Sequence, residues 1–79
     1  MSGYTTEEIQ NIFNNHSDNS MVFEDPIKGY LFHLTSEKGL FKMTTTVNDN
    51  ILGSGQVIWS IYQQAFVGNN YNIPISWKV

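Results

Sequence analysis

The residue types that most often perform chemistry are sparse in this chain of 79 residues. It has two histidines, His16 and His33, and no cysteine. A zinc site needs three or four ligands at suitable spacing, and neither an HxxxH nor an HExxH pattern occurs. We interpret His33 as a structural or surface residue of a strand, and His16 as a solvent-exposed residue of a loop rich in Asn and Ser. The sequence therefore predicts no metal site and no cofactor.

Ser54 lies between Gly53 and Gly55, ahead of an apolar segment. A serine in such a place suggests either a nucleophile or a cradle for an anion. The G-x-S-x-G elbow of serine hydrolases is absent, and no lysine or arginine lies nearby in the sequence. We therefore interpret Ser54 as an ordinary helix cap.

Two pairs of neighbouring carboxylates occur, Glu7–Glu8 and Glu24–Asp25. An acid–base pair needs side chains that converge in environments that separate their pKa values, and chain neighbours do not meet that need. Glu7 and Glu8 suit the start of a helix, and Asp25 before Pro26 is a typical turn residue. With no catalytic set in view, the sequence predicts that the protein is not an enzyme.

Charge is distributed unevenly along the chain. Residues 1–27 contain five acidic and no basic residues, no residue between Asp49 and Lys78 is charged, and there is no arginine. Binding along phosphates relies on clustered Lys and Arg, so the sequence predicts no binding of nucleic acid. No apolar run approaches the roughly 18–20 residues of a membrane span, so no membrane association is predicted either.

The first helix has the clearest local signal. Thr5 and Glu8 form a capping box, and Tyr4 and Ile9 occupy the two positions of a hydrophobic staple. The turn-prone residues that follow should end the helix. These features predict a helix over residues 6–15.

The middle of the chain reads as antiparallel strands. Residues 21–23 form a candidate short strand, and residues 29–35 and 40–47 alternate or are rich in β-branched and aromatic side chains. Ser36–Gly39 has the composition of a tight turn. We expect a hairpin here.

The segment 56–67 has high β propensity but a helical period. At 100° per residue its apolar side chains fill one arc, and Gln56, Ser60, Gln63 and Gln64 cluster in the remainder. We predict a helix near residues 55–67, capped by Ser54 and ended by Gly68. After it, apolar residues alternate strictly from Tyr71 to Val79, which predicts a final strand, and Pro74 favours an edge position.

Together these elements predict a single α+β domain over residues 1–79. A small antiparallel sheet of three to four strands would pack with two helices in the order α-β-β-β-α-β. The missing cysteines and the lack of an N-terminal signal peptide favour a cytoplasmic location.

The uncharged C-terminal third is the predicted contact region. Glutamine and serine can be desolvated at lower cost than charged groups, and a last strand could pair with another chain. We expect a protein partner, most simply a second copy in a homodimer, while the acidic N-terminal part would face a basic surface. The predicted partner-binding residues are Gln56, Trp59, Ser60, Gln63, Gln64, Tyr71, Trp77, Glu24 and Asp25.

Two functions remain as hypotheses. The first is a small protein-binding module that occludes a partner, as an inhibitor, adaptor or accessory subunit does. In size and acidity the chain is similar to some small phage-encoded inhibitors of bacterial enzymes, and its many Asn and Ile residues are typical of an AT-rich genome. The alternative is a protein that binds a small ligand in an aromatic pocket lined by Trp59, Tyr62, Tyr71 and Trp77, or in such a pocket at a subunit interface.

Overall fold

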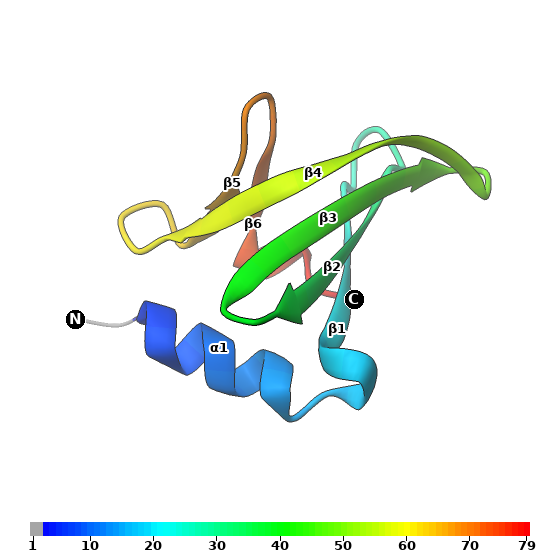
Figure 1. Cartoon of the computed structure of the whole chain (residues 1–79). Coiled ribbons are helices and arrows are strands. Elements are labelled where there is room, and N and C mark those ends of the chain that lie inside the picture. The colour runs from blue at the N-terminus through cyan, green and yellow to red at the C-terminus, as the bar shows by residue number, and fades with distance from the viewer. Residues whose placement is uncertain (1–2) are drawn as a thin grey trace.

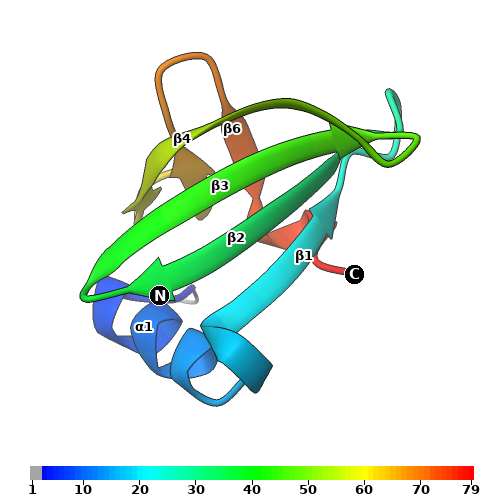
Figure 2. The same ribbon diagram turned by 45° about the vertical axis from the view of Figure 1, so that its right-hand side comes forward.

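The computed structural model describes residues 3–79 and shows a curled, six-stranded antiparallel sheet (Figures 1 and 2). The strands follow one another in chain order, and a nine-residue helix precedes them. The elements are α1 (Thr6–Asn14), η1 (Ser17–Asn19), β1 (Ser20–Glu24), β2 (Leu31–Glu37), β3 (Leu40–Val47), β4 (Asn50–Ser60), β5 (Ala65–Val67), β6 (Asn72–Pro74) and η2 (Ile75–Trp77), where η marks a short 3₁₀ helix.

The predicted α+β architecture is therefore wrong. The fold is mainly β, with 49% of residues in strands and, among the described residues, one α-helix where two were expected. The sheet has six strands where three to four were expected. Both errors come from the C-terminal third of the chain.

Helix α1 forms where its capping signals predict it. The Thr5 Oγ1 accepts a hydrogen bond from the Glu8 backbone N–H at 3.2 Å, and the Glu8 carboxylate accepts one from the Thr5 N–H at 2.9 Å. This capping box satisfies two of the N–H groups that a helix start leaves unpaired. Ile9 and Phe13 face the interior and are fully buried.

The predicted hairpin is confirmed as β2 and β3, and a second tight hairpin joins β3 to β4. The turn residues Lys38, Gly39, Asn48 and Asp49 all have positive φ, between 51° and 81°. Two-residue turns of this kind have a twist that matches the right-handed twist of the flanking strands. The candidate short strand at residues 21–23 is also present, as β1.

The helix predicted near residues 55–67 does not exist. Its residues form the second half of β4, a loop, and β5. The apparent helical arc combined two strands that lie on either side of a turn, and several of its apolar side chains point to solvent. Val57 and Trp59 are buried while Ile58, between them, is 64% exposed, which is the alternation of a strand. Here β propensity was the better guide.

The final strand is shorter than predicted. Strand β6 ends at Pro74, and the chain then turns through η2 toward β1. There, Lys78 forms a bridge with Phe23, and the Val79 N–H donates to the Val22 carbonyl at 3.0 Å. The last residues thus join the two ends of the sheet, and Figure 2 shows the C-terminus beside β1.

Aromatic side chains fill the interior of the curl. Phe66 contacts the rings of Phe13, Phe23, Phe41 and Trp59, with centroids 4.9 to 5.6 Å apart in edge-on geometry. Rings packed this way contribute more than their buried area alone. This core joins α1 to strands from both halves of the sheet.

Candidate functional site

The predicted partner-binding residues separate into two groups in the structure. Five of them lie in β4 or in the loop between β4 and β5, and three line a pocket near the C-terminus. The first group is Gln56, Trp59, Ser60, Gln63 and Gln64, and the second is Asp25, Tyr71 and Trp77. Glu24 belongs to neither group; it is exposed at the end of β1.

The side chain of Gln64 holds the loop between β4 and β5 in place. Its Oε1 accepts from the backbone N–H of Tyr4 at 2.6 Å, and its Nε2 donates to the carbonyls of Tyr4 and Ile61 at 3.0 and 2.9 Å. The Ser60 hydroxyl accepts from the Gln63 N–H at 3.3 Å. The loop is therefore ordered by its own polar residues and by the segment before α1.

Trp59 is part of the core. It is 7% exposed, its ring packs against Phe66, and its indole Nε1–H donates to the Tyr4 carbonyl at 3.0 Å. The structure therefore does not assemble the aromatic pocket predicted from Trp59, Tyr62, Tyr71 and Trp77. Trp59 is internal and Tyr62 lies in the loop between β4 and β5, whereas Tyr71 and Trp77 line a common pocket.

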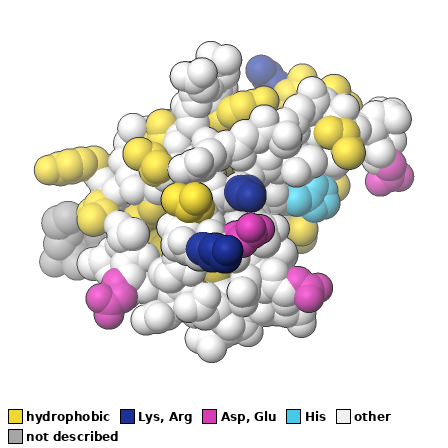
Figure 3. All heavy atoms as spheres, in the orientation of Figure 1, with side chains coloured by type: hydrophobic (Ala, Val, Ile, Leu, Met, Phe, Trp, Pro, Cys, Tyr) yellow, Lys and Arg dark blue, Asp and Glu magenta, His cyan; other side chains and the backbone are white. Residues whose placement is uncertain are grey.

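Exposed apolar side chains gather where that loop projects. Tyr62 is 100% exposed, and Ile58, Ile61 and Leu40 are also exposed. We call Leu40, Ile58, Ile61 and Tyr62 the loop-end surface. Figure 3 shows hydrophobic side chains over this end of the molecule. Leu40, Ile58 and Gln56 also line one shallow cavity of about 150 Å³.

Sequence reasoning missed the exposure of this surface because it assigned Ile58, Ile61 and Tyr62 to the buried arc of a helix. A strand register with Val57 and Trp59 facing inward would have placed Ile58 outward. The signal was present in the sequence but was outweighed by the apparent period.

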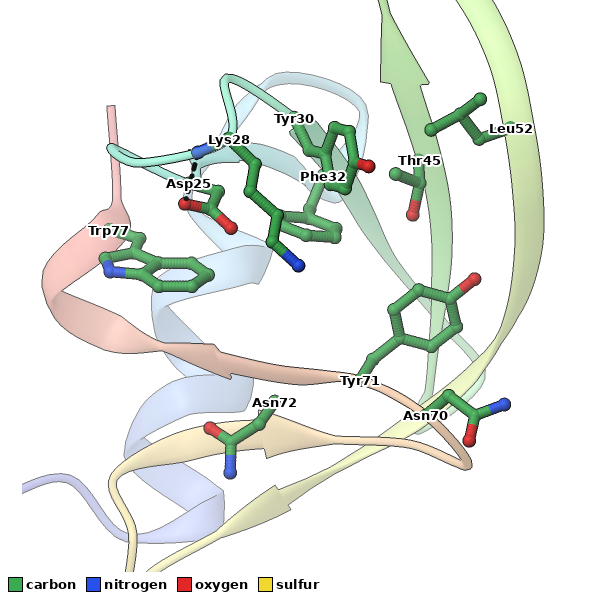
Figure 4. Close-up of a pocket in the computed structure, with 10 residues that line it drawn as sticks. All are labelled: Asp25, Lys28, Tyr30, Phe32, Thr45, Leu52, Asn70, Tyr71, Asn72 and Trp77. Atoms are coloured by element: carbon green, nitrogen blue, oxygen red, sulfur yellow. Dashed lines mark hydrogen bonds between the residues drawn. The ribbon is translucent and has the colours of Figure 1, made fainter.

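A second feature is a pocket of about 320 Å³ that lies between the turn from β1 to β2, strand β4, the β5–β6 loop and η2 (Figure 4). Its wall is aromatic: the rings of Trp77 and Phe32 stack with centroids 6.1 Å apart and planes 14° apart, and Tyr71 meets Phe32 edge-on at 6.4 Å. The residues that line it are Asp25, Lys28, Tyr30, Phe32, Thr45, Leu52, Asn70, Tyr71, Asn72 and Trp77.

Two charged residues reach this pocket from the turn between β1 and β2. The Asp25 Oδ1 accepts from the backbone N–H groups of Ile27 and Lys28 at 2.8 and 3.0 Å, so this carboxylate stabilises the turn. Asp25 is largely buried, which removes it from the exposed acidic surface that was expected to meet a partner. The Lys28 ammonium extends over the pocket (Figure 4).

Strand β4 borders the same pocket and is paired along only one side for much of its length. It pairs with β3 from Asn50 to Val57, but its pairing with β5 begins at Ile58. The register with β3 shifts between Thr45 and Thr46, so Leu52 is an extra residue in β4, a β-bulge. Leu52 lines the pocket.

Comparison of the chain with family models, curated proteins and solved structures found no match. The features that could carry a function are the loop-end surface, the pocket and the β4 edge.

The two histidines lie apart from each other, and neither lines the aromatic pocket. His33 Nε2 lies 3.1 Å from the Thr46 hydroxyl on the exposed face of the sheet, and His16 precedes η1. Within residues 3–79, no three His, Asp or Glu side chains lie close enough together to hold a metal ion. In the same range, no helix has the length and apolar character needed to span a membrane.

Proposed function

We propose that this chain is a small protein-binding module that occludes part of a partner, in the role of an inhibitor, adaptor or accessory subunit. The observation that supports the proposal is the loop-end surface, with Tyr62 fully exposed on a loop held by Gln64. No catalytic step is needed for this role. The absence of cysteine supports a cytoplasmic setting.

A tyrosine presented in this way is suited to anchor an interface. Tyrosine brings a large contact area with few rotatable bonds, and it is enriched among the residues that dominate binding energy. A loop already ordered by hydrogen bonds loses little conformational freedom on binding. The neighbouring isoleucines, leucine and Gln56 carry no charge that a partner would have to desolvate.

The rim of this surface carries charges of both signs, with Lys42 opposite Gln56 on the exposed face of β3 and β4. Thr6 of α1 lines the same shallow cavity as Leu40 and Ile58, so the first turn of α1, with the exposed Glu7 and Glu8, lies beside the loop-end surface. An apolar centre with a charged rim is the usual anatomy of an interface. A complementary partner has an apolar pocket with charges of both signs around it.

A second candidate function is the binding of a small molecule in the aromatic pocket. The stacked Phe32 and Trp77, the Tyr71 ring and the Lys28 ammonium support it, because small-molecule sites combine an apolar lining with a few polar groups. This candidate uses two of the four aromatic residues expected from the sequence.

Site-specific photo-crosslinking tests the first function. A photoreactive phenylalanine analogue replaces Tyr62 in one variant and Asn48, at the far turn between β3 and β4, in the control. In the native host we expect a discrete crosslinked partner from position 62 that position 48 does not produce. Identical patterns from both positions would contradict the proposal.

Once that partner is purified, Tyr62→Ala should weaken its binding by about 30-fold, the loss typical of an interface anchor. The unfolding midpoint of the variant should stay unchanged because Tyr62 makes no buried contact. Tyr62→Phe keeps the ring and should retain most of the affinity.

A further inference from the structure

We propose that the free edge of β4 and the adjacent aromatic pocket bind an extended segment of another polypeptide. The segment would add to the sheet as a strand beside β4 and place one aromatic side chain in the pocket. This site is distinct from the loop-end surface and goes beyond the function proposed above.

The first observation is the unpaired edge. From Asn50 to Val57 the backbone of β4 is paired with β3, and within the described residues no strand pairs with its other side before Ile58. Backbone N–H and C=O groups alternate in direction along a strand, so about every second residue here turns its groups away from β3. Such groups need a partner in water or in another chain.

The second observation is that this edge has little of the usual protection against added strands. Proteins commonly blunt an exposed edge with lysine, proline, inward-pointing charge or a β-bulge. Strand β4 has no charged residue and no proline from Asn50 to Ser60. Its one irregularity, the bulge at Leu52, directs that side chain into the wall of the pocket.

The third observation is that the pocket adjoins the free edge. Leu52 of β4 forms one wall, and Asn70 and Tyr71 of the β5–β6 loop form another (Figure 4). The Tyr71 hydroxyl lies 3.5 Å from where a Cβ on Gly53 would be. Tyr71 therefore reaches across to the middle of the unpaired stretch.

The β5–β6 loop closes one end of this site. At Gly68 an added Cβ would lie 3.3 Å from the Gln56 carbonyl oxygen and 3.0 Å from Val57 Cγ1. The two segments are thus in contact at Gln56, while within the described residues no strand pairs with that side of β4 from Asn50 to Gly55. The open stretch is long enough to pair with a segment of five or six residues, the usual length of a strand.

These features specify the occupant. Only an extended backbone presents donors and acceptors at the spacing of a strand edge, and alternate side chains then enter pockets on one face. The aromatic wall of Phe32, Tyr71 and Trp77 favours an aromatic side chain, over which the Lys28 ammonium would make a cation–π contact. A second copy paired edge to edge by two-fold symmetry fits less well. The β5–β6 loops of both copies would then lie against the same pair of β4 strands.

The test begins with random peptides of about a dozen residues displayed on phage and selected on the full-length chain. We expect enriched peptides to share one aromatic residue with no proline beside it. Bound to the ¹⁵N-labelled protein, a synthetic copy should slow amide hydrogen exchange within residues 50–56 by about tenfold or more. A selection without enrichment, or peptides that protect other strands, would overturn the proposal.

An N-methyl scan of the selected peptide tests the strand geometry without altering the protein. N-methylation removes one backbone N–H donor of the peptide at a time. Binding should weaken where that N–H faces β4, at every second residue, and should persist at the residues between. A uniform loss, or loss at the aromatic residue alone, would refute strand addition. Equal binding of N-acetyl-phenylalanine amide and the whole peptide would show a small-molecule pocket instead and would overturn the inference.

Two neighbouring substitutions on β4 test the pocket. Leu52→Asp places a charge in the pocket wall and should weaken peptide binding by about tenfold or more, whereas Ile51→Asp, whose side chain does not line the pocket, should change it less than about threefold. Both residues are exposed, at 55% and 72%, so both variants should fold, as their ¹⁵N spectra would show. Equal effects of the two substitutions would contradict the site. Tyr62→Ala should leave peptide binding intact, which separates this site from the loop-end surface.

Discussion

At the scale of single residues, the glutamines show how one side chain can be read in two ways. Gln63 and Gln64 were predicted as a polar contact face because they are uncharged. In the structure Gln64 bonds to Tyr4 and Ile61, and the Gln63 amide oxygen accepts from the Asn72 side chain. Their amides hold the loop together, and the side chains they hold outward are apolar.

Gln64→Ala should therefore lower the free energy of unfolding by about 1–2 kcal/mol, because it removes three hydrogen bonds that include both backbone groups of Tyr4. Gln63→Ala removes one bond at an exposed position and should cost less than about 0.5 kcal/mol. Urea unfolding followed by tryptophan fluorescence measures both. Equal losses would mean that Gln64 does not have the special role assigned to it.

At the scale of elements, two glycines show how backbone conformation differs between a turn and a strand. Gly39 has a φ of 81° in the turn between β2 and β3, whereas Gly55 lies in β4 without a positive φ. Around both positions an added Cβ would meet nothing within 4 Å. The two glycines therefore differ in backbone conformation and share open surroundings.

The pair makes a clean test of turn strain. Gly39→Ala should destabilise the protein by about 1–2 kcal/mol, since an L side chain is disfavoured at positive φ. Gly55→Ala should be neutral or stabilise by up to about 1 kcal/mol, because glycine weakens a strand interior. Thermal and urea unfolding of both variants supply the comparison. A loss of stability in Gly55→Ala as large as that in Gly39→Ala would argue against this backbone assignment of β4.

At the scale of the whole molecule, the chain closes on itself. The bridge between Phe23 and Lys78 and the bond from Val79 to Val22 use the C-terminal segment internally. The last strand therefore does not offer the long edge for pairing with a second copy that its alternation suggested. Self-association through the last strand would therefore rely on side chains.

We expect a homodimer formed through the loop-end surface, where Ile58, Ile61 and Tyr62 of the C-terminal third are exposed. Sedimentation equilibrium at about 100 µM should show dimers with a Kd near or below about 10 µM. The variant Tyr62→Asp should be monomeric, because its dimer would have to bury a charge. A wild-type protein that is monomeric at this concentration would exclude the homodimer. The loop-end surface would then be proposed to bind a different protein only.

The sequence by itself determined the elements whose signals are local. The capping box of Thr5 and Glu8 acts within one helical turn, and the hairpin of β2 and β3 depends on its strand propensity and on a tight turn between neighbouring strands. Such signals survive without knowledge of the rest of the chain, because the groups that satisfy one another lie a few residues apart.

Tertiary structure decided the C-terminal third and the candidate sites. Whether Ile58 is buried depends on which face of β4 meets the core, and Phe66, far along the chain from α1, supplies one of the two rings that pack against Phe13. The pocket joins Asp25, Leu52 and Trp77, which are brought together only by the curl of the sheet. A hydrophobic pattern records how much apolar surface a segment must bury, but burial is non-directional, so the pattern alone does not say against what.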